Sequence, residues 1–213
     1  MIVTAEPTGP PATDAAVIEE SWAAPERFEA IFRRHFGQIH RYLAARVGGR
    51  TADDLAAEVF TIAFAQRQRY DLARECARPW LYGIATNLVS AYRRREQRRY
   101  RALARMAAHG VAPSDEDLVA DRVSAAAARP ALAAALAGLG RGDRDVLLLV
   151  AVAGLDNQEV ALSLGIPYGT VCSRLSRARA RLRDSLGGAN PAGSYGPAGN
   201  IRPVRGQKEQ PSG

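Results

Sequence analysis

The chain has 213 residues, of which 47% are hydrophobic but only 7% aromatic, and its formal net charge is +7. At roughly 100–200 residues per domain, this length suits one large domain or two small ones. The basic excess favours a polyanionic partner, either nucleic acid or an anionic membrane surface. Cys76 and Cys172 lie far apart and no histidines cluster near them, so we expect no disulfide framework, no metal site and no cofactor.

Residues 1–24 contain acidic residues and prolines but no basic or apolar stretch, which argues against a signal peptide. No segment approaches the ~18 consecutive apolar residues that a membrane helix needs. Two cysteines without a pairing pattern fit a reducing compartment. We therefore expect a cytoplasmic protein without membrane insertion, beginning with a flexible leader over residues 1–24.

Three helices are predicted over residues 25–100, which we expect to form a first compact domain. Apolar residues recur every three or four positions over 28–47, as they do on one face of a helix. Thr51 followed by Asp54 resembles a capping box, which would start the second helix near position 51. Pro79 suits the first position of the third helix. The polar stretch between the second and third helices is predicted to be a loop.

The third predicted helix combines aromatic residues at its start, an amide in its middle and arginines at its end. Aromatic rings can stack on unpaired bases at about 1–3 kcal/mol each, an amide can bind a base edge, and arginines can neutralise phosphates. The residues concerned are Trp80, Tyr82, Asn87, Arg93, Arg94 and Arg95. The alternative is that Trp80, four residues before Ile84, belongs to the core and the arginines form a solvated face.

The rest of the chain divides by composition. Residues 101–130 are rich in alanine and include a short acidic patch, and we expect them to form a linker with partial helix. Residues 131–186 are predicted to form a second domain of four short helices separated by glycines. Residues 187–213 are rich in Gly, Pro, Ser and Asn and are predicted to be a disordered tail.

The strongest local pattern is a helix-turn-helix over residues 155–186. Asp156 and Glu159 are predicted to cap its first helix, and Gly165 occupies the turn, where the backbone needs a positive φ. The last helix is apolar on one side and carries hydroxyls and guanidiniums on another, as major-groove recognition requires. Its polar side consists of Thr170, Ser173, Arg174, Arg177 and Arg181. The alternative is an ordinary helical hairpin with a solvated arginine face.

Together these features resemble the extracytoplasmic-function sigma factors of bacteria. The string over 52–60 is similar to the family's acidic clamp-binding helix, and the string over 79–88 is similar to its strand-opening helix. Residues 155–183 are similar to the family's sigma-4 domain, with Gly165 to Val171 and then Ser173, Arg174 and Leu175 matching its pattern. The resemblance implies an all-α fold: a sigma-2-like domain and a sigma-4-like helix-turn-helix domain joined by a flexible linker.

The resemblance also implies a role for each matching position of the first domain. Asp53, Asp54 and Glu58 would face the clamp of the largest subunit of core RNA polymerase, although acidic residues here also complement the helix dipole. Asn87 would read a base of the minus-ten promoter element. The loop from Tyr70 to Arg78 would receive a flipped base.

In the second domain, the resemblance implies that the last helix reads the minus-thirty-five element. The matching positions are Ser173, Arg174, Ser176 and Arg177. One departure from the family pattern is Cys172, which stands where a lysine or arginine is usual and so removes one expected contact. The full set of predicted DNA contacts is Tyr70, Trp80, Asn87, Arg93, Arg94, Arg95, Thr170, Ser173, Arg174, Ser176 and Arg177.

The sequence therefore predicts a sigma factor, not an enzyme, whose partners are core RNA polymerase and promoter DNA. An anti-sigma factor is a further candidate partner. The main alternative is a stand-alone helix-turn-helix regulator with an N-terminal sensing or dimerisation domain. An enzyme is less favoured, because the sequence has no P-loop, no nucleophile with a paired base and no metal-ligand spacing.

Overall fold

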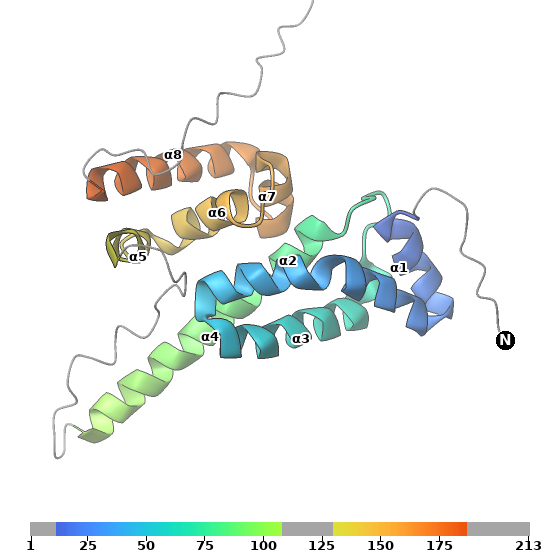
Figure 1. The fold of residues 1–213 in the computed structure, drawn as a ribbon, viewed down its shortest axis with the longest axis horizontal. Helices are drawn as coiled ribbons and strands as arrows, with labels where there is room; N and C mark the ends of the chain where they lie inside the picture. Colours follow the sequence, from blue (N-terminus) through green and yellow to red (C-terminus); the bar gives the residue numbers. More distant parts are fainter. Residues whose placement is uncertain (1–11, 108–129, 187–213) are drawn as a thin grey trace, which may run out of the picture.

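In a computed structural model, residues 12–107 and 130–186 are described, and every regular element within them is a helix (Figure 1). The all-α prediction is thus confirmed. The elements are α1 (Asp14–Ala23), η1 (Pro25–Phe28), α2 (Glu29–Val47), α3 (Gly49–Gln66), η2 (Arg67–Arg69), α4 (Arg78–Ala107), α5 (Pro130–Ala137), α6 (Arg141–Ala151), α7 (Asn157–Leu164) and α8 (Tyr168–Ser185).

Helices α2, α3 and α4 pack around the core of the first domain, where Ile39, Leu43, Val59 and Leu81 are fully buried. The predicted capping box at the start of α3 is wrong. Gly48 alone separates α2 from α3, and its φ of 82° lets the chain reverse direction within one residue. The helix therefore begins ahead of the predicted cap and has no side-chain cap hydrogen bond.

The N-terminal segment differs from the flexible leader that the sequence predicts. Residues Asp14–Ala23 form helix α1, capped by Thr13, whose Oγ1 accepts a hydrogen bond from the Ala16 N–H at 3.2 Å. Val17 and Ile18 are buried against the first domain. Sequence patterns missed this helix because it is short and its buried face includes the polar residues Asp14 and Ser21.

Helix α4 continues to Ala107, into the segment from residue 101 that we expected to be a linker with partial helix. Arginine and alanine, which dominate this end, are both strong helix formers. The acidic patch of the predicted linker and the predicted disordered tail lie outside the described residues, so those predictions stay open.

The second domain consists of α5 to α8, and its helix boundaries fall close to the predicted ones. Asp156 and Glu159 form the expected capping box around the start of α7. Gly165 ends α7 in the left-handed conformation with φ 61°, which opens the tight turn into α8. Val171, Leu175, Ala178 and Leu182 bury one side of α8, as their spacing predicted.

The two domains pack directly against each other, which the sequence did not predict. One continuous core includes Val89 of α4 and Val160 of α7. In Figure 1 the second domain lies over the side of the first domain formed by α2 and the start of α4, and α3 lies on the opposite side. No helix among the described residues is both long and apolar enough to span a bilayer.

Candidate nucleic-acid interface

Helix α8 presents its predicted polar side only in part to solvent. Ser173 and Ser176 are exposed, whereas Thr170 is half-buried. The Ser173 hydroxyl donates to the Thr170 carbonyl oxygen at 3.0 Å, a local bond that water or a DNA group can replace. The exposed middle of the helix thus presents two hydroxyl groups beside the exposed side chain of Arg177.

The arginines of α8 lean toward the N-terminus of α6. Arg177 pairs with Asp143, with Nη2 and Oδ1 3.2 Å apart, and Arg181 lies 3.9 Å from the same carboxylate. The Arg174 guanidinium covers Gly142, where a side-chain Cβ would lie only 2.8 Å from Nη1. The side chains of Arg177 and Arg181 are more than half exposed, so DNA can reach both guanidiniums, whereas the shared Asp143 carboxylate is only 11% exposed.

Cys172 is half-buried on the flank of α8 that faces the start of α7. Asn157 Nδ2 donates to its Sγ at 3.8 Å. This contact has the character of packing within the helix-turn-helix. The thiol therefore fills a position where a longer basic side chain would extend toward solvent.

Helix α4 displays Asn87 on an exposed turn, and Arg94 and Arg95 are exposed beyond it. Arg93 differs from these two arginines, because its Nη2 donates to the carbonyl oxygen of Arg46 at 3.0 Å and so ties α4 to the end of α2. Trp80 is half-buried, with its ring centroid 5.0 Å from that of Tyr70. The structure thus keeps Asn87, Arg94 and Arg95 accessible on one helix.

Two aromatic residues expected near DNA are buried. Tyr82 is only 1% exposed, and its ring packs edge-on against that of Tyr42 with the ring centroids 5.2 Å apart. Burial raises the pKa of the Tyr82 hydroxyl. Tyr82 is therefore not accessible for stacking on a base. Tyr70 is 7% exposed and its hydroxyl donates to the Arg74 carbonyl oxygen at 2.6 Å. Burial also raises the pKa of Tyr70, and its role in DNA contact stays a prediction.

The acidic residues of α3 form an exposed face of the first domain. Asp54 and Glu58, four residues apart, lie on the same side of the helix and are both exposed. Asp53 is also exposed, and its Oδ1 lies 2.7 Å from His40 Nε2 of α2. The structure therefore brings the three predicted polymerase-contact residues together on an accessible surface.

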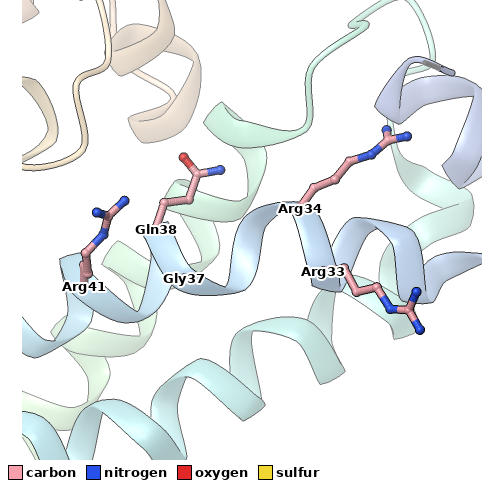
Figure 2. A pocket seen from close by; sticks show the side chains of 5 residues that line it. All are labelled: Arg33, Arg34, Gly37, Gln38 and Arg41. Atoms are coloured by element: carbon pink, nitrogen blue, oxygen red, sulfur yellow. The ribbon is translucent and has the colours of Figure 1, made fainter. Parts of the chain in front are cut away.

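A basic cavity on α2 was not singled out from the sequence. Figure 2 shows Arg33, Arg34, Gln38 and Arg41 projecting from this helix around Gly37, and the space they line is about 590 Å³. Three of these side chains lie at positions 34, 38 and 41, a spacing that places them on one face of a helix. That spacing is the signal that sequence analysis could have used.

Arg34 has other contacts, because its Nη1 donates to the Ala12 carbonyl oxygen at 2.8 Å and lies 3.0 Å from Asp14 Oδ1.

Among the described residues no group of His, Cys, Asp and Glu side chains has the arrangement of a metal site. The exposed polar groups of these surfaces are hydroxyl, amide and guanidinium groups on α4 and α8, and carboxylates on α3.

Two family models match the chain. The model described as Sigma-70 region 2 matches residues 31–99, and the model described as Sigma-70, region 4 matches residues 129–182. The first match runs from α2 through α3 into α4 and includes its arginine run, and the second runs from α5 into α8. The two matches therefore coincide with the two helical domains and follow the same order along the chain.

Curated relatives match across both domains. The ECF RNA polymerase sigma factor SigE of Mycolicibacterium smegmatis is 34% identical over 188 residues, which is 85% of this chain and 68% of the relative. The ECF RNA polymerase sigma factor SigM of Mycobacterium tuberculosis is 35% identical over 169 residues, which is 76% of this chain and 79% of the relative.

Solved structures with the same fold include CnrH in complex with the cytosolic domain of CnrY, with a TM-score of 0.59 and 23% identity. The match covers 83% of this chain and 99% of CnrH. The sigma factor RpoE of Bartonella quintana, in complex with the anti-sigma factor NepR, has a TM-score of 0.56 and 19% identity, covering 76% and 98% of the two chains. At these identities the likeness concerns the fold.

Proposed function

Since the chain belongs to the extracytoplasmic-function sigma factors, as its sequence indicated, we propose that its two helical domains contact promoter DNA at two separate places. The protein is a transcription initiation factor that binds core RNA polymerase and directs it to promoters. The observation that supports this function most strongly is the pair of sigma-70 matches, region 2 over residues 31–99 and region 4 over residues 129–182.

In this proposal, α8 enters the major groove of the minus-thirty-five element. Ser173 and Ser176 contact bases or backbone at the centre of the helix, and Thr170 contacts the backbone near its start. Arg174 and Arg177 leave their intramolecular contacts and bind guanine edges or phosphates. The side chain of Arg177 is more than half exposed, which supports this exchange because a DNA group can reach its guanidinium.

The proposed strand-reading surface lies on α4 and the loop before it. Asn87 binds a base of the minus-ten element, Trp80 supplies part of the aromatic wall, and Arg94 and Arg95 neutralise phosphates. Arg93 contributes by fixing α4 to α2 and by adding positive charge nearby. Unstacking a base costs a few kcal/mol, and a pocket at the loop beside Tyr70 would offset that cost.

The acidic face of α3 is the proposed polymerase contact. Asp53, Asp54 and Glu58 carry three negative charges on an accessible surface of a protein whose net charge is +7. An isolated acidic face on a basic protein suits a basic partner surface, such as the one we infer on the polymerase clamp. Its distance from the second domain leaves it open to a large partner (Figure 1).

We infer that the protein acts in the cytoplasm, together with polymerase and the chromosome, and that it performs no catalysis itself. We infer an anti-sigma factor as a regulator by analogy with RpoE of Bartonella quintana, which was solved in complex with the anti-sigma factor NepR. A stand-alone DNA-binding regulator is not favoured, because residues 31–99 match sigma-70 region 2 rather than a sensing domain.

The decisive test is run-off transcription with purified core polymerase on fragmented genomic DNA, followed by sequencing of the transcript starts. We expect a set of starts that appears only with this protein and shares two upstream elements. A variant with Asp54 and Glu58 both changed to lysine serves as the control and should lose activity without loss of fold. Absence of protein-dependent starts, or no association with core polymerase, would contradict the proposal.

A further inference from the structure

Two arginines of α8 share one carboxylate of α6. Arg177 makes two contacts with Asp143, from Nη2 to Oδ1 at 3.2 Å and from Nε to Oδ2 at 3.5 Å. Arg181 lies farther away, with its Nη1 3.9 Å from Oδ2 of the same carboxylate. Both arginine side chains are more than half exposed, whereas Asp143 is buried. The carboxylate is therefore the fixed member of this group, and the two guanidiniums are the members that can move.

The Asp143 carboxylate depends on a cationic partner because it is largely withdrawn from water. It lies in the first turn of α6, where the positive end of the helix dipole stabilises a negative charge. The dipole replaces only part of the hydration that a buried carboxylate loses, and a hydrogen-bonding cation supplies the rest. If Arg177 leaves for DNA, the carboxylate loses the two hydrogen bonds that Arg177 donates. That loss opposes DNA binding unless another cation takes the place of Arg177.

Arg181 is placed to become that second partner. It follows Arg177 by four residues, so the two side chains project from the same flank of α8. Its guanidinium already lies over the start of α6, because a Cβ on Gly140 would lie 3.9 Å from Arg181 Nη1. A charged hydrogen bond to a carboxylate is about 2.7–2.9 Å long, so a shift of roughly 1 Å completes one. The other acid of α6, Asp145, pairs with Arg46 of α2 and is already engaged.

We propose that Arg181 is a positioning residue for the DNA contact of α8, because it takes over the Asp143 carboxylate when Arg177 leaves for DNA. The proposal rests on the function proposed above for the DNA contact of Arg177. The exchange keeps one guanidinium on Asp143 in both states, so Arg177 reaches the groove without stranding a buried charge. Arg181 acts through Asp143 and does not itself touch DNA.

The exchange of partners is tested first without DNA, by urea unfolding of the full chain. Arg181→Ala should change the unfolding equilibrium constant little in the wild-type background, since Arg177 still holds Asp143. In the Arg177→Ala background the same change should raise the constant about fivefold, because Arg181 is then the partner of the carboxylate. Adding Asp143→Asn should abolish this difference. Exposed Arg183→Ala is the matched control and should have the same small effect in every background.

The use of the exchange is tested by the binding of reconstituted holoenzyme to a fluorescent promoter duplex from a mapped start. Arg181→Ala should weaken promoter binding about tenfold, whereas Arg181→Lys, which keeps a donor for the carboxylate, should retain most of it. The loss should disappear in the Arg177→Ala and Asp143→Asn backgrounds. The salt dependence of binding should match that of wild type, because a residue that does not touch a phosphate releases no counterion.

Equal effects of Arg181→Ala on unfolding with and without Arg177 would overturn the exchange. A loss of promoter binding that persists in the Arg177→Ala and Asp143→Asn backgrounds, with a shallower salt dependence, would make Arg181 a phosphate contact and overturn its positioning role. A third outcome is that unfolding shows the exchange while Arg177→Ala leaves promoter binding unchanged. That result would contradict the proposed DNA contact of Arg177, and with it the positioning role, while supporting the exchange in the free protein.

Discussion

Asp14 accepts a hydrogen bond from the backbone N–H of Ala77 at 2.9 Å, although 63 residues separate them in the chain. The same carboxylate lies 2.7 Å from His35 Nε2 of α2. The backbone N–H groups of Asp14 and Ala15 both donate to the Glu75 carbonyl oxygen, at 3.0 and 3.4 Å. Helix α1 therefore hydrogen-bonds to the loop before α4, at Glu75 and Ala77. This is the loop proposed to receive a flipped base.

The first prediction concerns Asp14 and pH. Burial alone would raise the pKa of this carboxyl, but hydrogen bonds from His35 and Ala77 outweigh burial and hold it at about 2, below the usual 3.8. The lowered pKa stabilises the fold at pH values above about 4, and that stability is lost as the pH falls toward 2. Asp14→Asn should therefore lower the free energy of unfolding by about 2 kcal/mol at pH 6.

Urea unfolding at pH 6 and at pH 3 measures this effect, and the difference between wild type and Asp14→Asn should shrink at the lower pH. Glu19→Gln, an exposed position of the same helix, is the matched control and should change stability little at either pH. Equal losses at both pH values would show that Asp14 acts by packing and not through its charge.

The contacts that the sequence predicted are local ones. The capping box of Asp156 and Glu159 and the turn at Gly165 depend on residues within a few positions of one another, so their spacing alone reveals them. The partners of Asp14 and Asp145 come from distant segments, and no periodicity marks them. Polar residues that become buried at such long-range contacts look like surface residues in the sequence, which explains why α1 and the domain interface were not predicted.

The same reasoning applies within the candidate site. Ser173 was placed on the polar side of α8 by helical spacing, and Asn87 and Glu58 were assigned from the family resemblance; all three are exposed. Tyr82 could not be assigned in this way, because whether an aromatic residue on α4 faces the core or the solvent depends on where α2 packs. Arg93 likewise resembles its neighbours in sequence, but the end of α2 makes it a structural contact.

The second prediction concerns Asn87. Changing Asn87 to alanine removes an exposed amide from α4 without touching the core, so the fold and polymerase binding should be retained. Transcription from a mapped promoter should fall about tenfold, since one base contact is worth about 1–3 kcal/mol. Gln97→Ala, another exposed amide of α4, is the control and should leave transcription nearly unchanged. Loss of polymerase binding by Asn87→Ala would mean that its role is structural.

The third prediction concerns the acidic face of α3. Glu58→Lys should weaken association with core polymerase by roughly 1 kcal/mol or more, because it replaces an attraction with a repulsion at the edge of an interface. Affinity measured at rising salt should fall less steeply for this variant than for wild type. Asp184→Lys makes the same kind of charge reversal on α8 and should not alter polymerase affinity. Equal effects of the two variants would point to net charge and away from a contact at α3.

The last prediction separates base reading from phosphate binding on α8. Arg177 can present two parallel donors to a guanine, which lysine cannot do, whereas both side chains can neutralise a phosphate. If Arg177 reads a base, Arg177→Lys and Arg177→Ala should both lower transcription, by about 1–3 kcal/mol of discrimination, and only on promoters with one particular base at the contacted position. If it binds a phosphate, Arg177→Lys should keep most activity and Arg177→Ala should weaken all promoters alike.

Transcription from a promoter library measures this pattern, with exposed Arg183→Ala near the end of the same helix as the control. We expect the base-specific pattern, because the pair with Asp143 already holds the Arg177 guanidinium in an extended, two-contact geometry, and a uniform loss across the library would contradict that expectation.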